Sequence, residues 1–163
     1  MKSPKNKEIK HEWHLVDVKD QVLGRISTQI AQYLMGKNKS YFVRNLDLGD
    51  FVVVINASGV KVTGNKTNTK KYYRHSGYPG GFRMETLKEL MGRDSTQVIK
   101  HAVSGMLPDN RLKDKMLARL FIFKGPEHKY TDKFSAKGGS ASGGKTSADA
   151  KALADKQNSK VKS

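Results

Sequence analysis

Apolar residues recur along the chain in two spacings, one typical of strands and one of helices. Residues 13–18 (WHLVDV) and 120–125 (LFIFKG) have the short apolar runs that predict strands. Residues 50–57 (DFVVVINA) are continuously apolar and rich in β-branched residues. Such a run is expected of a strand that is covered on both faces in a parallel sheet. Residues 71–74 are a further candidate strand within a stretch rich in turn formers.

Helical spacing of apolar residues predicts helices over residues 21–36, 84–92, 94–108 and 110–120. Gly36 is placed to end the first of these helices, and Asp94 or Ser95 can cap the third. The order of strand, helix, strand, helices and strand indicates an α/β layer architecture with a largely parallel sheet.

Composition divides the 163 residues into three parts. Residues 1–12 form a basic arm that we expect to be flexible, and residues 13–134 are predicted to form a single α/β domain. Residues 135–163 are Ser, Ala, Gly and Lys with hardly any larger apolar side chain, so this low-complexity basic tail is predicted to be disordered. Deleting the tail should therefore leave thermal stability nearly intact.

The charge balance indicates the kind of partner. The chain has 31 Lys and Arg against 15 Asp and Glu, a formal net charge of +16, which is typical of proteins that bind polyanions. It has no cysteine, so disulfides and thiolate metal sites are excluded. No apolar run reaches the length of a membrane span and the first residues lack a secretion signal, so we expect a cytoplasmic protein with no membrane partner. We also expect no cofactor.

The strongest functional signal is a stretch without acids. No Asp or Glu occurs from Phe51 to Met84, while basic and aromatic residues interleave there. Cations can neutralise phosphates, and flat side chains can stack on unpaired bases, which suits RNA. Tyr72 and Tyr73 would alternate in a strand, so one of the two is expected to pack inward. The candidate RNA-binding residues of this stretch are Lys61, Lys66, Lys70, Lys71, Tyr72, Tyr73, Arg74, His75, Tyr78 and Arg83.

Further basic positions lie outside this stretch. In the predicted helix over 110–120, basic residues recur every fourth position and form one stripe beside the apolar one. A solvated face and a phosphate-binding face would both give this stripe, and we favour the second. These additional candidates are Arg111, Lys115 and Arg119 in the stripe, Lys37, Lys39 and Arg44 in a weaker patch, and Lys124 and His128 near the end of the domain.

The letters G-x-x-x-x-G-K-T at residues 139–146 match a phosphate-binding loop. Such a loop needs a buried strand before it and a helix after it, and neither is predicted in this Gly- and Ser-rich segment. A second near match, at residues 58–67, displaces its lysine by one position. We therefore do not expect nucleoside triphosphate binding, and no nucleophile, paired carboxylate or histidine constellation indicates a catalytic site.

Seven motifs, in order and at consistent spacing between Trp13 and His128, resemble the bacterial-type large-subunit ribosomal protein L-thirteen family. They are VLGRISTQIA, GKNK, GDFVVVINA, KVTGNK, YYRHSGYPGG, AVSGMLPDNRL and FKGPEH. The resemblance implies a three-layer α/β/α fold around a four-stranded parallel sheet of order 3-2-1-4. It also implies a structural place in the large ribosomal subunit, bound to its ribosomal RNA and beside neighbouring ribosomal proteins, with early entry into assembly.

Three functions are compatible with these features. The first is a structural ribosomal protein, not a homo-oligomer by itself, that supports assembly and translation. The second is a small enzyme or nucleotide-binding domain, and the third is a regulatory binder of RNA or DNA outside the ribosome. Loss of saturable ATP binding in Lys145→Ala would favour the second, and co-sedimentation with large subunits would separate the first from the third.

Overall fold

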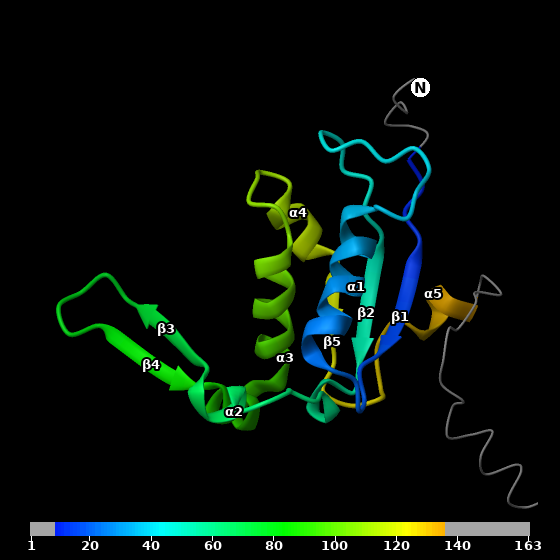
Figure 1. Cartoon of the computed structure of the whole chain (residues 1–163). Helices are drawn as coiled ribbons and strands as arrows, with labels where there is room; N and C mark the ends of the chain where they lie inside the picture. The colour runs from blue at the N-terminus through cyan, green and yellow to red at the C-terminus, as the bar shows by residue number, and fades with distance from the viewer. Residues whose placement is uncertain (1–8, 136–163) are drawn as a thin grey trace, which may run out of the picture.

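A parallel sheet forms the centre of the protein in the computed structural model, which describes residues 9–135 (Figure 1). Its strands are β1 (Trp13–Asp17), β2 (Phe51–Ile55) and β5 (Leu120–Ile122), in the order β1-β2-β5. Val53 of the central strand is fully buried and lies opposite Leu15 and Phe121 in the two neighbouring strands. The expected α/β class with a parallel sheet is thereby confirmed.

The expectation of four parallel strands in the order 3-2-1-4 is not confirmed. Among residues 9–135 the parallel sheet has three strands, and the candidate strand over 71–74 forms part of a separate ribbon. This ribbon consists of β3 (Lys71–His75) and β4 (Phe82–Thr86), which pair antiparallel. The sequence KYYRH explains the difference, because a strand inside a parallel sheet must be apolar on both faces.

Three helices cover one face of the sheet: α1 (Leu23–Met35), α3 (Leu87–Met106) and α4 (Lys113–Ala118). The core between them and the sheet contains fully buried side chains of Ile30 and Leu34 from α1, Val52 and Val54 from β2, and Ile99 from α3. The spacing that predicts the first helix is thus the spacing of its buried face.

Helix α1 ends where the sequence predicts. Gly36 adopts a left-handed conformation with φ of 74°, and its N–H donates to the carbonyl oxygen of Tyr33. A Cβ at this position would lie 2.6 Å from the carbonyl oxygen of Leu48, so both the backbone angle and the space require glycine.

The helices predicted over 84–92 and 94–108 form the single helix α3, which is interrupted at Asp94. Asp94 has non-helical angles (φ −153°, ψ 94°), and its carboxylate accepts a hydrogen bond from the N–H of Thr96 at 3.2 Å, as a capping residue does. The first part begins at Leu87 instead of residue 84. The reason is a capping box, in which Thr86 and Glu89 each accept a hydrogen bond from the other's backbone N–H.

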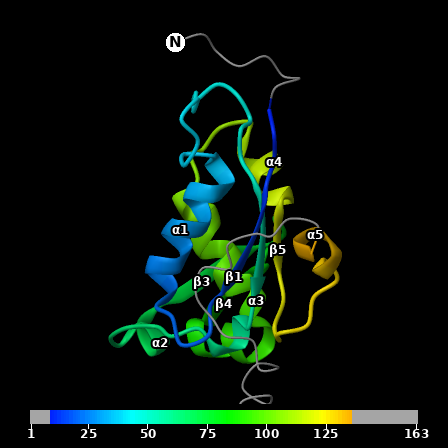
Figure 2. The ribbon, with the colours of Figure 1, turned by 90° about the vertical axis from the view of Figure 1, so that its right-hand side faces the viewer.

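Aromatic residues cover the opposite face of the sheet, next to the short helix α5 (Thr131–Ser135; Figure 2). The Trp13 ring stacks on Phe51 with centroids 4.5 Å apart and lies 5.2 Å from the Tyr130 ring. Phe134 of α5 meets Trp13 edge-on at 6.3 Å. The sequence did not predict α5. Two further short helices, η2 (Ala57–Gly59) and α2 (Lys66–Thr69), connect β2 to the ribbon.

The proposed arm and tail lie mostly outside the described residues, which exclude 1–8 and 136–163. The described end of the arm is held against the domain: the Glu12 N–H donates to Asp50 Oδ1 at 2.9 Å, and Lys39 donates to the Lys10 carbonyl oxygen. Within the described part of the chain, no helix is long and apolar enough to cross a membrane.

Candidate nucleic-acid interface

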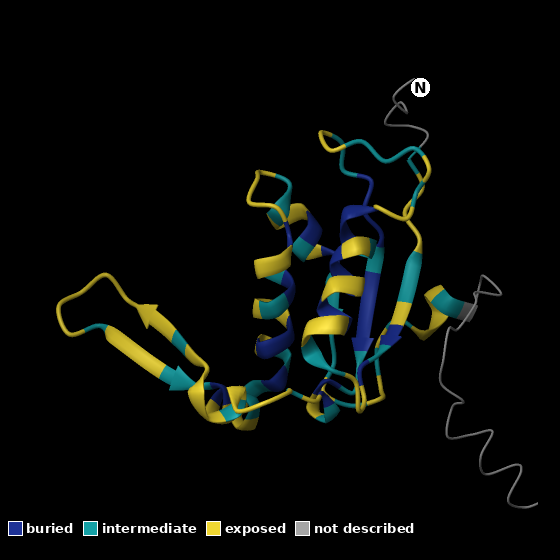
Figure 3. Cartoon of the chain, in the orientation of Figure 1, coloured by how far each residue is buried: buried dark blue, intermediate teal, exposed yellow. Residues whose placement is uncertain are grey.

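The β3–β4 ribbon projects from the body of the domain, and most of it is exposed (Figure 3). In an antiparallel ladder, residues opposite each other share a face. Tyr73 lies opposite Met84 and His75 lies opposite Phe82, so one face of the ribbon is largely aromatic and apolar. Tyr73 and Phe82 are 64% and 60% exposed, and their rings stack with centroids 5.8 Å apart. Large apolar side chains gathered on an exposed face indicate a binding surface.

The other face of the ribbon is basic. Arg74 and Arg83 lie directly opposite each other, and among residues 9–135 neither forms an ion pair or a hydrogen bond through its side chain. Like charges in this position repel and weaken a ribbon. The single acid of the ribbon, Glu85, pairs with Arg93 of α3 at 2.5 Å and leaves the two arginines without a carboxylate. Two paired anionic groups, such as adjacent phosphates, would relieve this repulsion.

The turn of the ribbon exposes a further ring. Gly77 and Gly80 have φ of 88° and 73°, a left-handed backbone that favours glycine, and they place Tyr78 at the tip between them. Tyr78 is 76% exposed. A tight glycine turn with an exposed tyrosine can enter a narrow groove or a loop of a nucleic acid.

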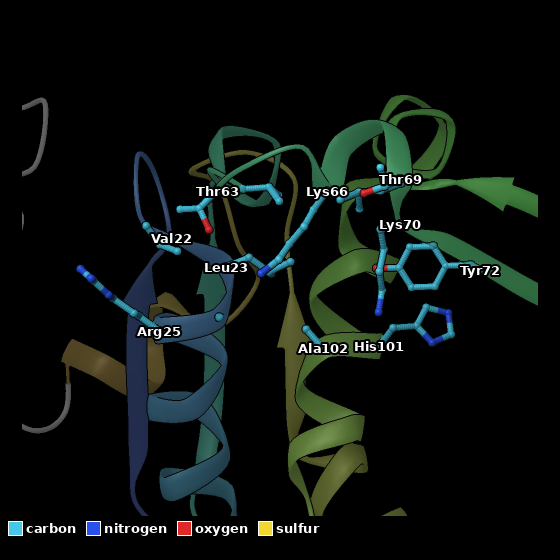
Figure 4. A pocket seen from close by; sticks show the side chains of 13 residues that line it. Val22, Leu23, Arg25, Thr63, Lys66, Thr69, Lys70, Tyr72, His101 and Ala102 are labelled. Atoms are coloured by element: carbon cyan, nitrogen blue, oxygen red, sulfur yellow. The ribbon is translucent and has the colours of Figure 1, made fainter.

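A pocket of about 710 Å³ lies at the base of the ribbon (Figure 4). Two of its lining residues are lysines: Lys66 is the first residue of α2, and Lys70 is the residue that caps its C-terminal end. Lys70 Nζ lies 5.6 Å from the centre of the Tyr72 ring, and that ring is 5.5 Å from the ring of His101 on α3. No Asp or Glu lines the pocket, whose residues are Val22, Leu23, Gly24, Arg25, Val62, Thr63, Lys66, Thr69, Lys70, Tyr72, Leu87, His101 and Ala102.

Tyr72 is the inward member of the tyrosine pair, as the alternation predicts. It packs against the small cluster of Leu87, Leu90 and Val98, and its burial raises the pKa of the phenol. Its ring therefore joins the ribbon to the pocket, while Tyr73 remains on the exposed face.

Lys61 is exposed at the edge of this region but has an acid partner. Its Nζ lies 2.9 Å from Asp20 Oδ1, and this hydrogen bond and the lysine charge hold the pKa of Asp20 below its usual value. Lys71, by contrast, forms no ion pair among residues 9–135 and points to the same face as Tyr73. The structure thus brings together the ribbon and pocket residues that the sequence predicts, with Lys61 at their margin.

The basic stripe predicted over 110–120 does not form. Helix α4 begins at Lys113, so Arg111 lies in the turn before it, and Arg119 follows its end. Arg119 is buried, and its guanidinium donates two hydrogen bonds to the carboxylate of Asp47, one of them 2.6 Å long. Burial would raise the pKa of Asp47, but the hydrogen bonds and charge of Arg119 outweigh it and lower that pKa. This geometry gives Arg119 a structural position instead of the predicted phosphate-facing one; Lys115 stays exposed.

The weaker patch predicted at Lys37, Lys39 and Arg44 does not form one surface either. Lys39 turns inward, where Nζ donates to Asp50 Oδ1 at 2.5 Å and to the Leu48 carbonyl oxygen at 2.7 Å. His14 Nε2 lies 3.2 Å from the other Asp50 oxygen, and these partners lower the pKa of Asp50 although its burial would raise it. Lys37 and Arg44 instead line a smaller pocket of about 370 Å³.

Lys124 and His128 lie away from the ribbon's exposed faces. Lys124 Nζ is 3.4 Å from Asp94 Oδ1 and thereby supports the kink of α3. The His128 ring lies 5.7 Å from Phe134 within the aromatic face of the sheet, and its Nδ1 accepts a hydrogen bond from the N–H of Tyr130. Both positions have structural partners, which weakens their assignment as RNA contacts.

Sequence reasoning missed two pocket residues, Arg25 and His101. Arg25 is the single Lys or Arg of the predicted first helix. Because no other basic residue lies on that helix, the charge pattern gave no sign of a binding role. His101 follows the inward stripe of its helix, and only the packing of Tyr72 shows that its ring faces the pocket. Among residues 9–135, no group of three or more His, Cys, Asp or Glu side chains could hold a metal ion.

Comparison with known proteins points to one family. The family model described as ribosomal protein L13 matches residues 11–129. A protein of Dehalococcoides mccartyi is 51% identical over 124 residues, which cover 76% of this chain and 87% of the relative. One of Lawsonia intracellularis is 51% identical over 128 residues (78% and 89%), and one of Thermobifida fusca is 45% identical over 126 residues (77% and 85%). Each of these relatives is named large ribosomal subunit protein uL13.

Proposed function

Because the chain belongs to the ribosomal protein L13 family, we propose that it is a structural component of the large ribosomal subunit. It binds the large-subunit ribosomal RNA, contacts neighbouring ribosomal proteins, and supports subunit assembly and translation in the cytoplasm. Its role is to hold RNA in place and not to catalyse a reaction.

The observation that carries the RNA contact is the ribbon itself. A two-stranded ribbon is marginally stable alone, and this one exposes stacked rings on one face and two opposed arginines on the other. Both features are unfavourable in water and favourable against RNA, where bases stack on the rings and phosphates separate the arginines. The ribbon is therefore built for insertion between RNA segments.

The proposed contact set follows from which cations have no acid partner. The principal contacts are Lys66, Lys70, Lys71, Tyr72, Tyr73, Arg74, His75, Tyr78 and Arg83 at the ribbon and pocket. Lys37, Arg44, Arg111 and Lys115 are proposed as peripheral phosphate contacts, since they stand away from the ribbon. Lys61 and Lys124 already face acids on the protein, and Lys39, Arg119 and His128 have structural positions.

We also propose that α5 forms the third layer of an α/β/α arrangement. This is supported by the contacts of Phe134 and Tyr130 with Trp13 on the face of the sheet opposite α1.

The function is tested with the full chain and purified ribosomal RNA. We expect the chain to bind large-subunit RNA in preference to small-subunit RNA at physiological salt, and to co-sediment with large subunits through a high-salt wash. Equal affinity for the two RNAs, together with loss from the particle during the wash, would contradict a structural place in the large subunit and favour a general nucleic-acid binder.

A further inference from the structure

We propose that the pocket at the base of the ribbon holds a single unstacked nucleotide of the bound RNA. This inference rests on the proposed function and specifies what part of the RNA is recognised. The pocket volume, about 710 Å³, lies in the range of pockets that enclose small organic ligands. A nucleotide turned out of its helix needs such a space, since both faces of its base must be covered again.

The lining is divided in the way a nucleotide requires. The floor is apolar, with Leu23 from α1, Val62 before α2, and Leu87 and Ala102 from α3. On one side the Tyr72 ring and the His101 ring stand 5.5 Å apart and inclined by 33°, which offers an aromatic wall for a base (Figure 4). The face of a base is apolar and polarisable, so it matches this floor and wall.

The cations stand where a sugar-phosphate chain would pass. Lys66 extends from α2 toward Leu23 of α1, and Lys70 runs beside the Tyr72 ring (Figure 4). Among residues 9–135 neither lysine forms an ion pair. Arg25 stands at the outer edge, with its side chain directed away from the centre of the pocket. These cations can bind the phosphates on either side of an inserted nucleotide.

The absence of acids in the lining decides against other occupants. A cationic peptide side chain would find no carboxylate, and an inorganic phosphate would gain nothing from the apolar floor. A nucleotide of RNA uses both parts at once. A bound nucleotide also explains why Tyr72 belongs both to the ribbon and to the pocket lining. An RNA strand that crosses the exposed face of β3 and β4 reaches the pocket at the base of the same ribbon.

The test uses the full chain bound to large-subunit ribosomal RNA, with ultraviolet cross-linking mapped to the residue and nucleotide. We expect Tyr72 or His101 to cross-link to a nucleotide that is unpaired in the RNA, and that base to be protected from chemical modification. Ala102→Phe, which fills the floor, should abolish this cross-link and weaken RNA binding about tenfold, the equivalent of one stacked base.

One control and one further variant separate an effect of filling the pocket from an effect of misfolding the protein. Gln29→Phe adds the same ring at an exposed position of α1 outside the pocket and should leave the cross-link unchanged. Lys66→Gln/Lys70→Gln changes only exposed side chains, so it should keep the melting temperature and still lose most of the cross-link. If RNA binding is retained but the pocket residues cross-link to paired nucleotides or to none, the pocket proposal is overturned and the proposed function stands.

Two further outcomes would also overturn the proposal. Saturable micromolar binding of free adenosine or guanosine monophosphate without RNA would assign the pocket to a small molecule. Failure of the unmodified chain to bind large-subunit RNA at all would remove the proposed function, and the pocket assignment with it.

Discussion

Arg74 of β3 and Arg83 of β4 lie directly across the ladder from each other, with no carboxylate bound to either among residues 9–135. The same strands contain Glu85, whose carboxylate is bound by Arg93 of the neighbouring helix. The ribbon thus keeps two cations together at a cost to its own stability. This arrangement is the most direct structural sign of a polyanionic partner.

Replacing both arginines should separate RNA affinity from stability. We expect Arg74→Gln/Arg83→Gln to weaken binding to large-subunit RNA and to make the slope of log affinity against log salt shallower by about 1.4 to 1.8 units, because two phosphate contacts are lost. The free chain should melt at the same or a slightly higher temperature, because the repulsion is removed. Binding titrations at several salt concentrations and thermal unfolding measure the two effects.

The matched control for this pair is Lys61→Gln/Lys113→Gln. These cations already face Asp20 and Asp109, which lie outside the ribbon, so their loss should change the salt slope by less than the ribbon pair does. A slope that is unchanged in the ribbon variant and shallower in the control variant would place the phosphate contacts outside the ribbon.

The pair of Arg119 and Asp47 should matter for folding and not for RNA. Asp47→Ala would leave the buried Arg119 guanidinium without its two hydrogen bonds, and we expect a loss of about 3 kcal/mol in the free energy of unfolding. Urea denaturation measures this loss. At temperatures where Arg119→Met remains folded, its salt slope should equal that of the unmodified chain; a shallower slope would show that Arg119 reaches phosphate.

Acid should destabilise the protein through two carboxylates, those of the partly buried Asp47 and the buried Asp50. The pKa values of Asp47 and Asp50 are lower in the folded chain than their usual value of about 3.9, so the unfolded chain binds more protons in acid. Their contribution is complete above about pH 5 and is lost as the pH falls through the folded pKa values. Melting temperature measured from pH 6 to pH 2.5 should therefore fall in this window.

Substitution identifies the carboxylate responsible. Asp47→Asn should be less stable at neutral pH and should show a flatter decline of melting temperature in acid. Asp109→Asn, in which an exposed carboxylate is removed, should follow the curve of the unmodified chain. If Asp47→Asn declines as steeply as the unmodified chain, the acid sensitivity belongs to other groups.

The aromatic face of the sheet can be followed through Trp13, the single tryptophan of the chain. Phe134→Ala removes the ring that meets Trp13 edge-on, so we expect a red-shifted Trp13 emission and a loss of about 1 to 2 kcal/mol in the free energy of unfolding, less than for a fully buried phenylalanine. Deletion of residues 136–163, which keeps Phe134, should change neither quantity. An equal effect of the deletion would show that the tail contributes to this face.

Some of the fold and of the site follows from sequence alone. The β-branched run at Val52–Val54, the helix marked by Ile30 and Leu34, and its end at Gly36 are local patterns, and local patterns record which face of an element is buried. The acid-free stretch from Phe51 to Met84 is also local, because a surface that binds phosphate excludes carboxylates over its whole length.

Tertiary structure decided the rest. Arg119 and Asp47 are 72 positions apart, and no spacing in the chain shows that they pair or that Arg119 is buried. Likewise, only strand pairing shows that β3 pairs with β4 instead of joining the central sheet, and that Arg74 faces Arg83. Only the packing of the ribbon against α3 shows that Tyr72 meets His101. Periodicity reports how a residue lies within its own element, whereas a partner, a buried charge or a pocket depends on which distant elements pack together.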